Sequence, residues 1–438
     1  MDHKLKLGVA QGVVTPKIGC LLYGYSSLPH ATGIHDDLHV TVFAFSQGET
    51  KALLISAEVC VLRTDIANAL RQDMEMMFGV PKGHIMIVCT HTHSGPAVAG
   101  MYSAWGDFDH EYYQGIFRPA LLDAVKRALE IMEPVTVGSA IGKSQVGINR
   151  RELTLEDKVI LGENEWGPYN PNMTVISFKK ESGERMASLV AYGAHGTSAG
   201  ASTLITRDWS GEMLDALEAH SGAVTAFFQG TEGDVGPRKI QSLPYACIDQ
   251  TEALGKIAAA DAIRIFDTIT EYKQVSLGVR EEPLQIPVLP RMPYEEVCRR
   301  CAEVTDVTKL GNMQRVEHDF NLWVKASYEE GYEEKDFYEL PQSVLSLGDI
   351  VFTGVTYELF SEIGMRIDKA FPDKNVISLS CTNGQDGYFP TRSQALLGGY
   401  EIIIFKNRLI QRLVDNADFY YIKETIRNIN ELEGQEER

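Results

Sequence analysis

The sequence is poor in cysteine, with seven among its 438 residues, an odd number dispersed along the chain. Such a set does not provide a disulfide framework and fits a reducing compartment. Cys298 and Cys301 form a C-x-x-C in a helix-prone stretch, but no second Cys or His pair lies nearby in the sequence to complete a zinc site. No apolar secretory segment follows the start MDHKLKLGVAQG. We therefore expect a cytoplasmic protein in which Cys298 and Cys301 are buried helical thiols.

Long apolar runs and an excess of positive charge are also missing. A bilayer span needs about 18 consecutive apolar residues, and no run in the sequence approaches that length. The formal net charge is -19 and is spread over both halves of the chain, which disfavours nucleic acid and anionic membrane surfaces as partners. We expect no transmembrane segment and a small-molecule substrate, and the sequence leaves the oligomeric state open.

The hydrophobic content of 44% is enough for a large core. Up to about residue 290, short β-rich runs alternate with helices, which predicts an α/β fold with a layered, mixed β-sheet core and flanking helices. Residues 292–338 are charged and helix-prone and predict a helical excursion from this core. Since repeats and flexible linkers are missing, we expect a single domain over residues 1–430 and a frayed tail at 431–438.

One predicted strand end carries two histidines. The stretch HIMIVCTHTHSGP contains a run, Ile85 to Cys89, whose length and β-branched content are typical of a strand buried on both faces. His91 and His93 follow it directly. In an extended chain, residues i and i+2 point to the same side, so both imidazoles are expected to face one point beyond the sheet. This geometry suits a metal or a catalytic pair, and a hydrogen-bonded surface or cap role is the alternative.

Other polar residues follow further apolar runs, and in layered α/β proteins ligand sites collect at such strand ends. Each has a simple structural explanation. Glu358 is expected to open a helix, where an anion is favourable in the first turn, while Tyr388 can be a packing residue and Asp234 a turn former. Together they offer imidazoles, carboxylates and a phenol oxygen, a ligand set that zinc accepts. The sequence therefore favours a catalytic zinc site. These residues are Glu58, His195, Glu232, Asp234, Glu358 and Tyr388.

Several of these motifs resemble those of the neutral/alkaline non-lysosomal ceramidases and their shorter bacterial relatives. THTHSGP in combination with HGTS is specific to that family, and the remaining pieces are weaker. The resemblance extends from about residue 33 to 401 and implies a single ceramidase-like catalytic domain. The other matching pieces are GIHDDLHVTVFAF, INRRE, GTEGDVGP, NGQDGYFPT and GGYE.

The resemblance implies a Zn²⁺ ion and specific roles for the strand-end residues. It makes His93 a catalytic histidine outside the ligand set and Arg150 the active-site arginine. The implied zinc ligands are His91, His195, Glu358 and Tyr388. Because the Pro-Gly-Glu of the family is Thr356-Tyr357-Glu358 here, Glu362 is the alternative carboxylate.

The sequence also departs from the family pattern. The loop GTEGDVGP implies that Asp234 and Gly236 lie in the substrate-binding region, but Gly236 stands where the family has a serine that takes part in amide cleavage. Long members of the family are exported and carry a C-terminal β-sandwich domain, whereas this sequence stops soon after the tyrosine region and shows no signal peptide. Ceramide itself is therefore not the expected substrate.

These observations predict a zinc-dependent hydrolase that cleaves an amide (N-acyl) bond. A zinc-bound water has a pKa of about 7, so the metal can supply the nucleophile that Gly236 cannot. His93 and Arg150 would assist by moving a proton and by holding the carbonyl oxygen. The alternatives are an ester or lactone hydrolase, a catalytically inactive binding protein, and a metal-dependent phosphoesterase. The last class usually uses two metals and more carboxylates.

Overall fold

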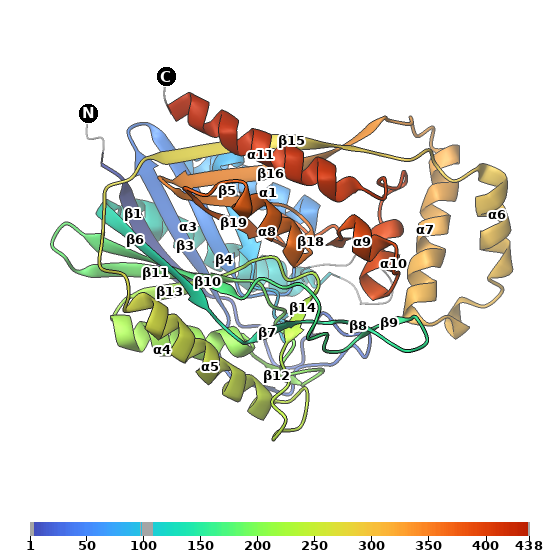
Figure 1. Ribbon diagram of the computed structural model, residues 1–438, viewed down its shortest axis with the longest axis horizontal. Helices are drawn as coiled ribbons and strands as arrows, with labels where there is room; N and C mark the ends of the chain where they lie inside the picture. The colour runs from blue at the N-terminus through green and yellow to red at the C-terminus, as the bar shows by residue number, and fades with distance from the viewer. Residues whose placement is uncertain (1–3, 97, 99–107, 437–438) are drawn as a thin grey trace.

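The computed structural model describes residues 4–96, 98 and 108–436. Two β-sheets pack face to face, and helices cover their outer faces (Figure 1). The first sheet has eight strands in the order β13-β11-β10-β6-β1-β3-β4-β5. Its strands, in chain order, are β1 Lys6–Val13, β3 His39–Gln47, β4 Thr50–Ala57, β5 Ile85–Cys89, β6 Glu133–Lys143, β10 Asn172–Lys180, β11 Arg185–Tyr192 and β13 Val224–Gln229.

The second sheet has four strands in the order β15-β16-β17-β19. Both sheets are mixed, because β4 and β5, β11 and β13, and β17 and β19 pair in parallel whereas the remaining neighbours are antiparallel. The predicted layered α/β fold with a mixed sheet core is therefore confirmed. The strands of this sheet are β15 Leu277–Pro287, β16 Phe337–Leu347, β17 Ile350–Gly354 and β19 Asn375–Leu379.

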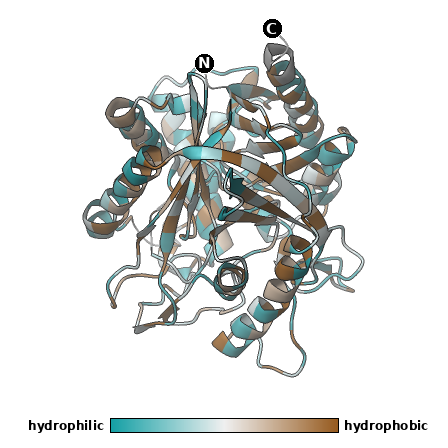
Figure 2. Ribbon diagram, turned by 90° about the vertical axis from the view of Figure 1, so that its left-hand side faces the viewer, coloured by the Kyte–Doolittle hydropathy of each residue, from teal (hydrophilic) through white to brown (hydrophobic). Residues whose placement is uncertain are grey.

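The core between the sheets is built from apolar side chains on their facing surfaces, including Phe43 and Val88 of the first sheet and Phe352 and Leu379 of the second. All five residues of β5 are buried, as expected for a strand covered on both faces. Figure 2 shows helices on both sides of the strands. The first sheet is covered by α1 Thr64–Phe78, α3 Arg118–Glu130, α4 Trp209–Ser221 and α5 Ile248–Phe266, and the second by α8 Ser361–Lys369 and α11 Ala417–Glu436.

The helical excursion lies between two paired strands. β15 and β16 run antiparallel from the pair Leu277 and Leu347 to the pair Pro287 and Phe337. The chain between them forms α6 Tyr294–Glu303 and α7 Asn312–Glu329, which lie at one end of the molecule (Figure 1). These helices share a small apolar cluster of their own.

The C-terminal helix extends further than the sequence indicates. A frayed tail is expected from residue 431, but α11 continues to Glu436, and Leu432 is buried against the outer face of the second sheet. Residues 437–438 of the expected tail lie outside the described residues. Within the described part of the chain, no helix is both long and apolar enough to cross a membrane.

Candidate metal centre

His91 follows β5, but not in the extended conformation that the sequence suggests. Its φ is 65°, in the left-handed region that non-glycine residues rarely adopt. The backbone therefore turns at His91. The two rings come together beyond this turn, and not because alternate side chains of an extended strand point to the same side. The Nε2 atoms of His91 and His93 lie 3.3 Å apart. The predicted proximity of the two imidazoles is correct, and the predicted reason for it is wrong.

His195 brings a third imidazole next to His91 and His93. It follows β11, and the ring centroids of His91 and His195 lie 4.7 Å apart. His195 Nδ1 lies 2.9 Å from the carbonyl oxygen of Glu232, and His91 Nδ1 lies 2.9 Å from that of Cys60. Because a carbonyl oxygen accepts only, each Nδ1 is the donor in its bond, which leaves Nε2 as the ring atom that a metal would bind.

Glu358 supplies a carboxylate between the two imidazoles. Its Oε2 lies 3.4 Å from His91 Nε2 and 3.1 Å from His195 Nε2. Its Oε1 accepts a hydrogen bond of 2.9 Å from Gln385 Nε2, which orients the carboxylate. Burial raises the pKa of Glu358, but the adjacent imidazoles, above all His91, outweigh burial and hold this pKa well below its usual value.

The local structure around Glu358 corrects one expectation. Glu358 does not begin a helix, because it lies in the short strand β18 Glu358–Leu359 and α8 begins at Ser361. Its Cα partner in the parallel strand β20 Tyr388–Phe389 is Tyr388. Glu362 lies on α8, where its carboxylate is paired with Arg366. Of the two candidate carboxylates, Glu358 is the one that reaches the imidazoles.

The buried polar atoms of this cluster fit a cation. Among the described residues, His195 Nε2 and Glu358 Oε2 are buried and have no hydrogen-bond partner. The donor atoms of His91, His195 and Glu358 lie within 4.8 Å of one another. Two ligands about 2.1 Å from a tetrahedral zinc ion are separated by about 3.4 Å, close to the distances found here. Burial also lowers the pKa of His195 to about 3, so this side chain is neutral, as a metal ligand must be.

Tyr388 and Arg150 lie beside this cluster. Tyr388 is buried and lines a small pocket of about 50 Å³ together with His91, His93 and Glu358. Arg150 Nε donates a 2.9 Å hydrogen bond to Glu401, and the guanidinium carbon lies 5.5 Å from the centre of the Tyr388 ring. Arg150 Nη2 is buried with no partner among the described residues. The guanidinium therefore has a free donor at this site.

His93 lies between the small pocket and a larger, open cavity of about 550 Å³. Its ring packs against Gly24, where a Cβ would lie only 2.4 Å from His93 Nδ1, so a side chain at residue 24 would displace the ring. Burial, together with His91 and His195, holds the pKa of His93 well below its usual value. His93 is therefore a neutral imidazole.

The larger cavity brings distant parts of the chain together. Arg150, Gly236, Tyr388 and Tyr400 line it beside His93. The first turn of α7, at Asn312 and Met313, also contributes to its wall, so the helical excursion reaches the site.

Asp234 and Gly236 have different positions in the loop between β13 and α5. The Asp234 carboxylate is buried and accepts hydrogen bonds from the backbone N–H of Ser361 at 2.7 Å and from Asn149 Nδ2 at 3.3 Å, so it braces the loop and is absent from the lining of both cavities described above. Gly236 does line the larger cavity and lies in the extended strand β14 Val235–Pro237. A Cβ at Gly236 would meet Arg150 Cβ at 3.3 Å.

Sequence reasoning did not identify Gln385 and Glu401, which orient Glu358 and Arg150. Gln385 lies in the NGQDGYFPT stretch and Glu401 in GGYE, the two tyrosine-region pieces of the resemblance. The sequence gives no direct signal for either role, because an amide or a carboxylate in a polar loop usually faces solvent.

Comparison with known proteins identifies the family. A sequence model described as the N-terminal part of neutral/alkaline non-lysosomal ceramidase matches residues 5–254. The chain belongs to this ceramidase family. The matched segment contains His91, His93, Arg150 and His195, but ends before Glu358 and Tyr388.

Individual neutral ceramidases are similar in sequence to part of this chain. Neutral ceramidase A of Dictyostelium discoideum is 27% identical over 240 residues, which cover 49% of this chain and 33% of that protein. Neutral ceramidase of Pseudomonas aeruginosa is 25% identical over 313 residues, or 67% of this chain and 46% of that protein. The aligned part of the chain thus spans between a third and a half of these curated relatives.

Solved structures show the same fold. The crystal structure of neutral ceramidase from Pseudomonas aeruginosa superposes with a TM-score of 0.75 at 18% identity, over 97% of this chain and 74% of that chain. A structure described as ceramidase complexed with C2 gives a TM-score of 0.76 at 18% identity, over 99% and 76% of the two chains. The likeness extends beyond residue 254 and includes the second sheet.

Proposed function

We propose that this protein is a zinc-dependent hydrolase that cleaves the amide bond of an N-acyl compound. The observation that carries the proposal is the convergence of His91, His195 and Glu358, with His195 Nε2 and Glu358 Oε2 buried and lacking hydrogen-bond partners among the described residues. Tyr388 is the proposed fourth ligand, because it is the register partner of Glu358 and lines the same pocket. Membership of a ceramidase family supports amide hydrolysis.

A bound Zn²⁺ would lower the pKa of a water molecule to about 7 and polarise the substrate carbonyl. The protein's own groups do the remaining work. Neutral His93 takes up the proton of the attacking water and delivers it to the leaving amine. Arg150 Nη2, which has no other partner among the described residues, donates a hydrogen bond to the carbonyl oxygen as negative charge develops there.

Gly236 defines how this chemistry differs from that implied for the family. Glycine supplies no hydroxyl group, so water is the proposed nucleophile. Residue 236 has no positive φ and lies in an extended strand, so its backbone conformation is open to serine as well as to glycine. The nearest obstacle to a new side chain is Arg150, whose Cβ would lie 3.3 Å from the added Cβ.

A second candidate function rests on the same residue. If the family reaction requires the serine, Gly236 makes this protein an inactive, ceramidase-like binding protein. An ester or lactone is the alternative substrate within the hydrolase class, since both present a carbonyl carbon to the same groups.

The test compares the wild type with Gly236→Ser on a panel of short- and long-chain N-acyl amides, esters and lactones, with zinc removed and then restored. Gly115→Ser is the control, because a Cβ at residue 115 meets no atom within 4 Å and this residue lines neither of the two cavities at the site. Zinc-dependent amide hydrolysis by the wild type and by the control supports the proposal. A wild type that is inert on every compound, together with an active Gly236→Ser variant, would replace it with the binding-protein function.

A further inference from the structure

A strained residue lies behind the two histidine-bearing loops. Asp208 immediately precedes α4 and has φ 59° and ψ -161°, a combination that is otherwise almost confined to glycine. It is 2% exposed, and both oxygens of its carboxylate accept hydrogen bonds from protein groups. A conformation of this kind persists only where the surrounding structure imposes it, and such residues cluster at functional sites.

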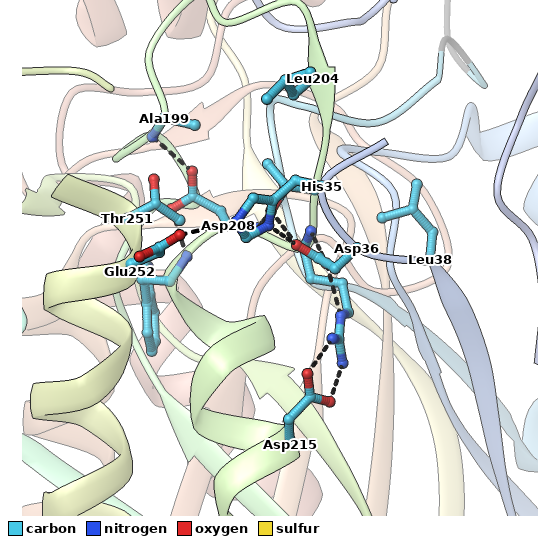
Figure 3. Close-up of polar contacts among 12 residues, drawn as sticks. His35, Asp36, Leu38, Ala199, Leu204, Asp208, Asp215, Thr251 and Glu252 are labelled. Atoms are coloured by element: carbon cyan, nitrogen blue, oxygen red, sulfur yellow. Dashed lines mark hydrogen bonds and ion pairs between the residues drawn. The ribbon is translucent and has the colours of Figure 1, made fainter. Parts of the chain in front are cut away.

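The Asp208 carboxylate accepts hydrogen bonds from the turn that follows His195. Its Oδ1 accepts hydrogen bonds from the backbone N–H and the hydroxyl of Ser198, at 3.1 and 2.5 Å. Its Oδ2 accepts a 2.9 Å bond from the backbone N–H of Ala199 (Figure 3). At the other end of the turn, the indole Nε1 of Trp209 donates to the carbonyl oxygen of His195 at 3.0 Å. Asp208 and Trp209 thus hold both ends of the His195 turn.

The segment before Asp208 also holds the loop of His91 and His93. Thr92 Oγ1 donates to the carbonyl oxygen of Thr206 at 2.7 Å, and the Thr206 N–H donates to the carbonyl oxygen of Ser94 at 3.2 Å. The His93 N–H in turn donates to the carbonyl oxygen of Gly196 at 2.9 Å. Both histidine-bearing loops are therefore anchored to residues 206–209.

Asp36 holds the segment 206–207 in place. Its Oδ1 accepts hydrogen bonds of 2.8 Å from both the backbone N–H and Nε of Arg207, and its Oδ2 accepts a 2.6 Å bond from the Thr206 hydroxyl. Figure 3 shows His35 between Asp36 and Glu252, with its Nδ1 2.6 Å from Asp36 Oδ2 and its Nε2 3.4 Å from Glu252 Oε1. The stretch GIHDD, which the metal cluster does not use, thus has a structural role at residues 206–208.

We propose that Asp208 is a positioning residue, held in its strained conformation by Asp36, that fixes His195 relative to His91 and so sets the geometry of the metal centre. The effect of Asp208 on zinc binding rests on the proposed function. Its effect on the position of the His195 ring does not.

The test is the isosteric variant Asp208→Asn, which keeps the size of the side chain but puts an NH₂ group against a backbone N–H donor. Zinc affinity, measured by competition with a chelator, is expected to fall about 10- to 100-fold, the range typical of groups that orient metal ligands. The control is Glu252→Gln at the outer end of the network, where the carboxylate lies 3.4 Å from His35 Nε2, and its zinc affinity is expected to equal that of the wild type.

The same variants show whether Asp208 only stabilises the fold. In that case Asp208→Asn would unfold at a lower temperature than the wild type, but the folded variant would bind zinc as tightly. That result would overturn the inference. Asp36→Asn provides a second variant should Asp208→Asn not fold, and it is expected to weaken zinc binding in the same direction.

A separate measurement on metal-free protein tests the positioning role even if the proposed zinc function is wrong. If the wild type takes up no zinc, the imidazole NMR signals of His91 and His195 become the readout. Asp208→Asn or Asp36→Asn should shift the His195 signals, and Glu252→Gln should not. Unchanged His195 signals in both aspartate variants would refute the positioning role whether or not zinc binds.

Discussion

At the scale of single residues, Glu358 supplies the carboxylate of the candidate metal centre. This buried carboxylate lies against two imidazoles, and Gln385 holds its other oxygen. A cation at the site would therefore meet one carboxylate and the Nε2 atoms of two imidazoles. Glu362, four residues later, also has a carboxylate, but this residue lies on α8 and its carboxylate is paired with Arg366.

The two glutamates form a matched pair for mutagenesis. We expect Glu358→Gln to lower zinc affinity by more than the roughly 10- to 100-fold typical of groups that only orient ligands, because it removes a proposed ligand and its charge. Glu362→Gln should retain zinc. Metal content and chelator competition on both purified variants check this, and zinc loss in Glu362→Gln instead would reverse the assignment of the carboxylate.

The second residue-scale prediction concerns His93 and Arg150. His93→Ala should lower kcat about 10²- to 10⁴-fold, as for loss of a proton-transfer group, and Arg150→Ala about 10²- to 10³-fold, as for loss of an oxyanion donor. Neither is assigned as a ligand, so zinc content should stay at the wild-type value. Zinc loss in His93→Ala would show that the roles of His91 and His93 are exchanged.

Single-residue chemistry was the part of the site most open to prediction. The residue types at strand ends and the resemblance pointed to His91, His195 and Glu358, which the structure places together. The left-handed backbone at His91 could not be predicted, because its cause is tertiary: its N–H donates to the carbonyl oxygen of Val59 and its ring to that of Cys60. No local pattern encodes either partner.

At the scale of secondary-structure elements, the site depends on two very short strands. β18 and β20 have two residues each, and their register places Glu358 opposite Tyr388. Strands this short show no alternation of apolar and polar residues, which is why the sequence suggested a helix start at Glu358. The longer elements, such as β5 and α5, carry the periodicity that made them predictable.

Gly233 tests the placement of β18. A Cβ at residue 233 would lie 2.5 Å from the carbonyl oxygen of Glu358 and 2.9 Å from that of Leu359, so Gly233→Ala must push this backbone away. We expect a loss of about 1 to 3 kcal/mol in the free energy of unfolding, typical of overpacking, together with weaker zinc binding. Denaturant titration and chelator competition measure the two effects.

The control for Gly233→Ala is Gly115→Ala, at a helical position with open space around the added methyl group. It should leave zinc affinity unchanged and stability equal or higher by up to about 1 kcal/mol, since alanine is the better helix former. Wild-type zinc affinity in a destabilised Gly233→Ala would show that β18 does not set the position of Glu358.

At the scale of the whole molecule, the candidate metal centre joins segments associated with both sheets. His91 and His195 follow strands of the eight-stranded sheet, whereas Glu358 and Tyr388 follow β17 and β19 of the four-stranded sheet. The sequence predicted the layers and the excursion at 292–338, since both rest on local patterns. It did not predict that α7 returns to the cavity, because that contact joins segments far apart in the chain.

A ligand that joins both sheets should stabilise the entire fold. With free zinc at about 1,000 times its Kd, we expect the free energy of unfolding to rise by about 4 kcal/mol, provided that the unfolded chain binds no zinc. The denaturation midpoint should increase for the wild type but not for His195→Ala. An unchanged midpoint in the wild type at saturating zinc would contradict a native metal site.

The order of the ligands along the chain has a consequence during protein synthesis. A ribosome makes about 5 to 20 residues per second, so Glu358 is added roughly 8 to 30 s after His195. Throughout that interval the nascent chain has both imidazoles but neither the carboxylate nor the phenol of the centre. On the proposed assignment, the ligand set is complete only after Tyr388 has been added, and a premature stop before residue 358 would yield a product with two of the four proposed ligands.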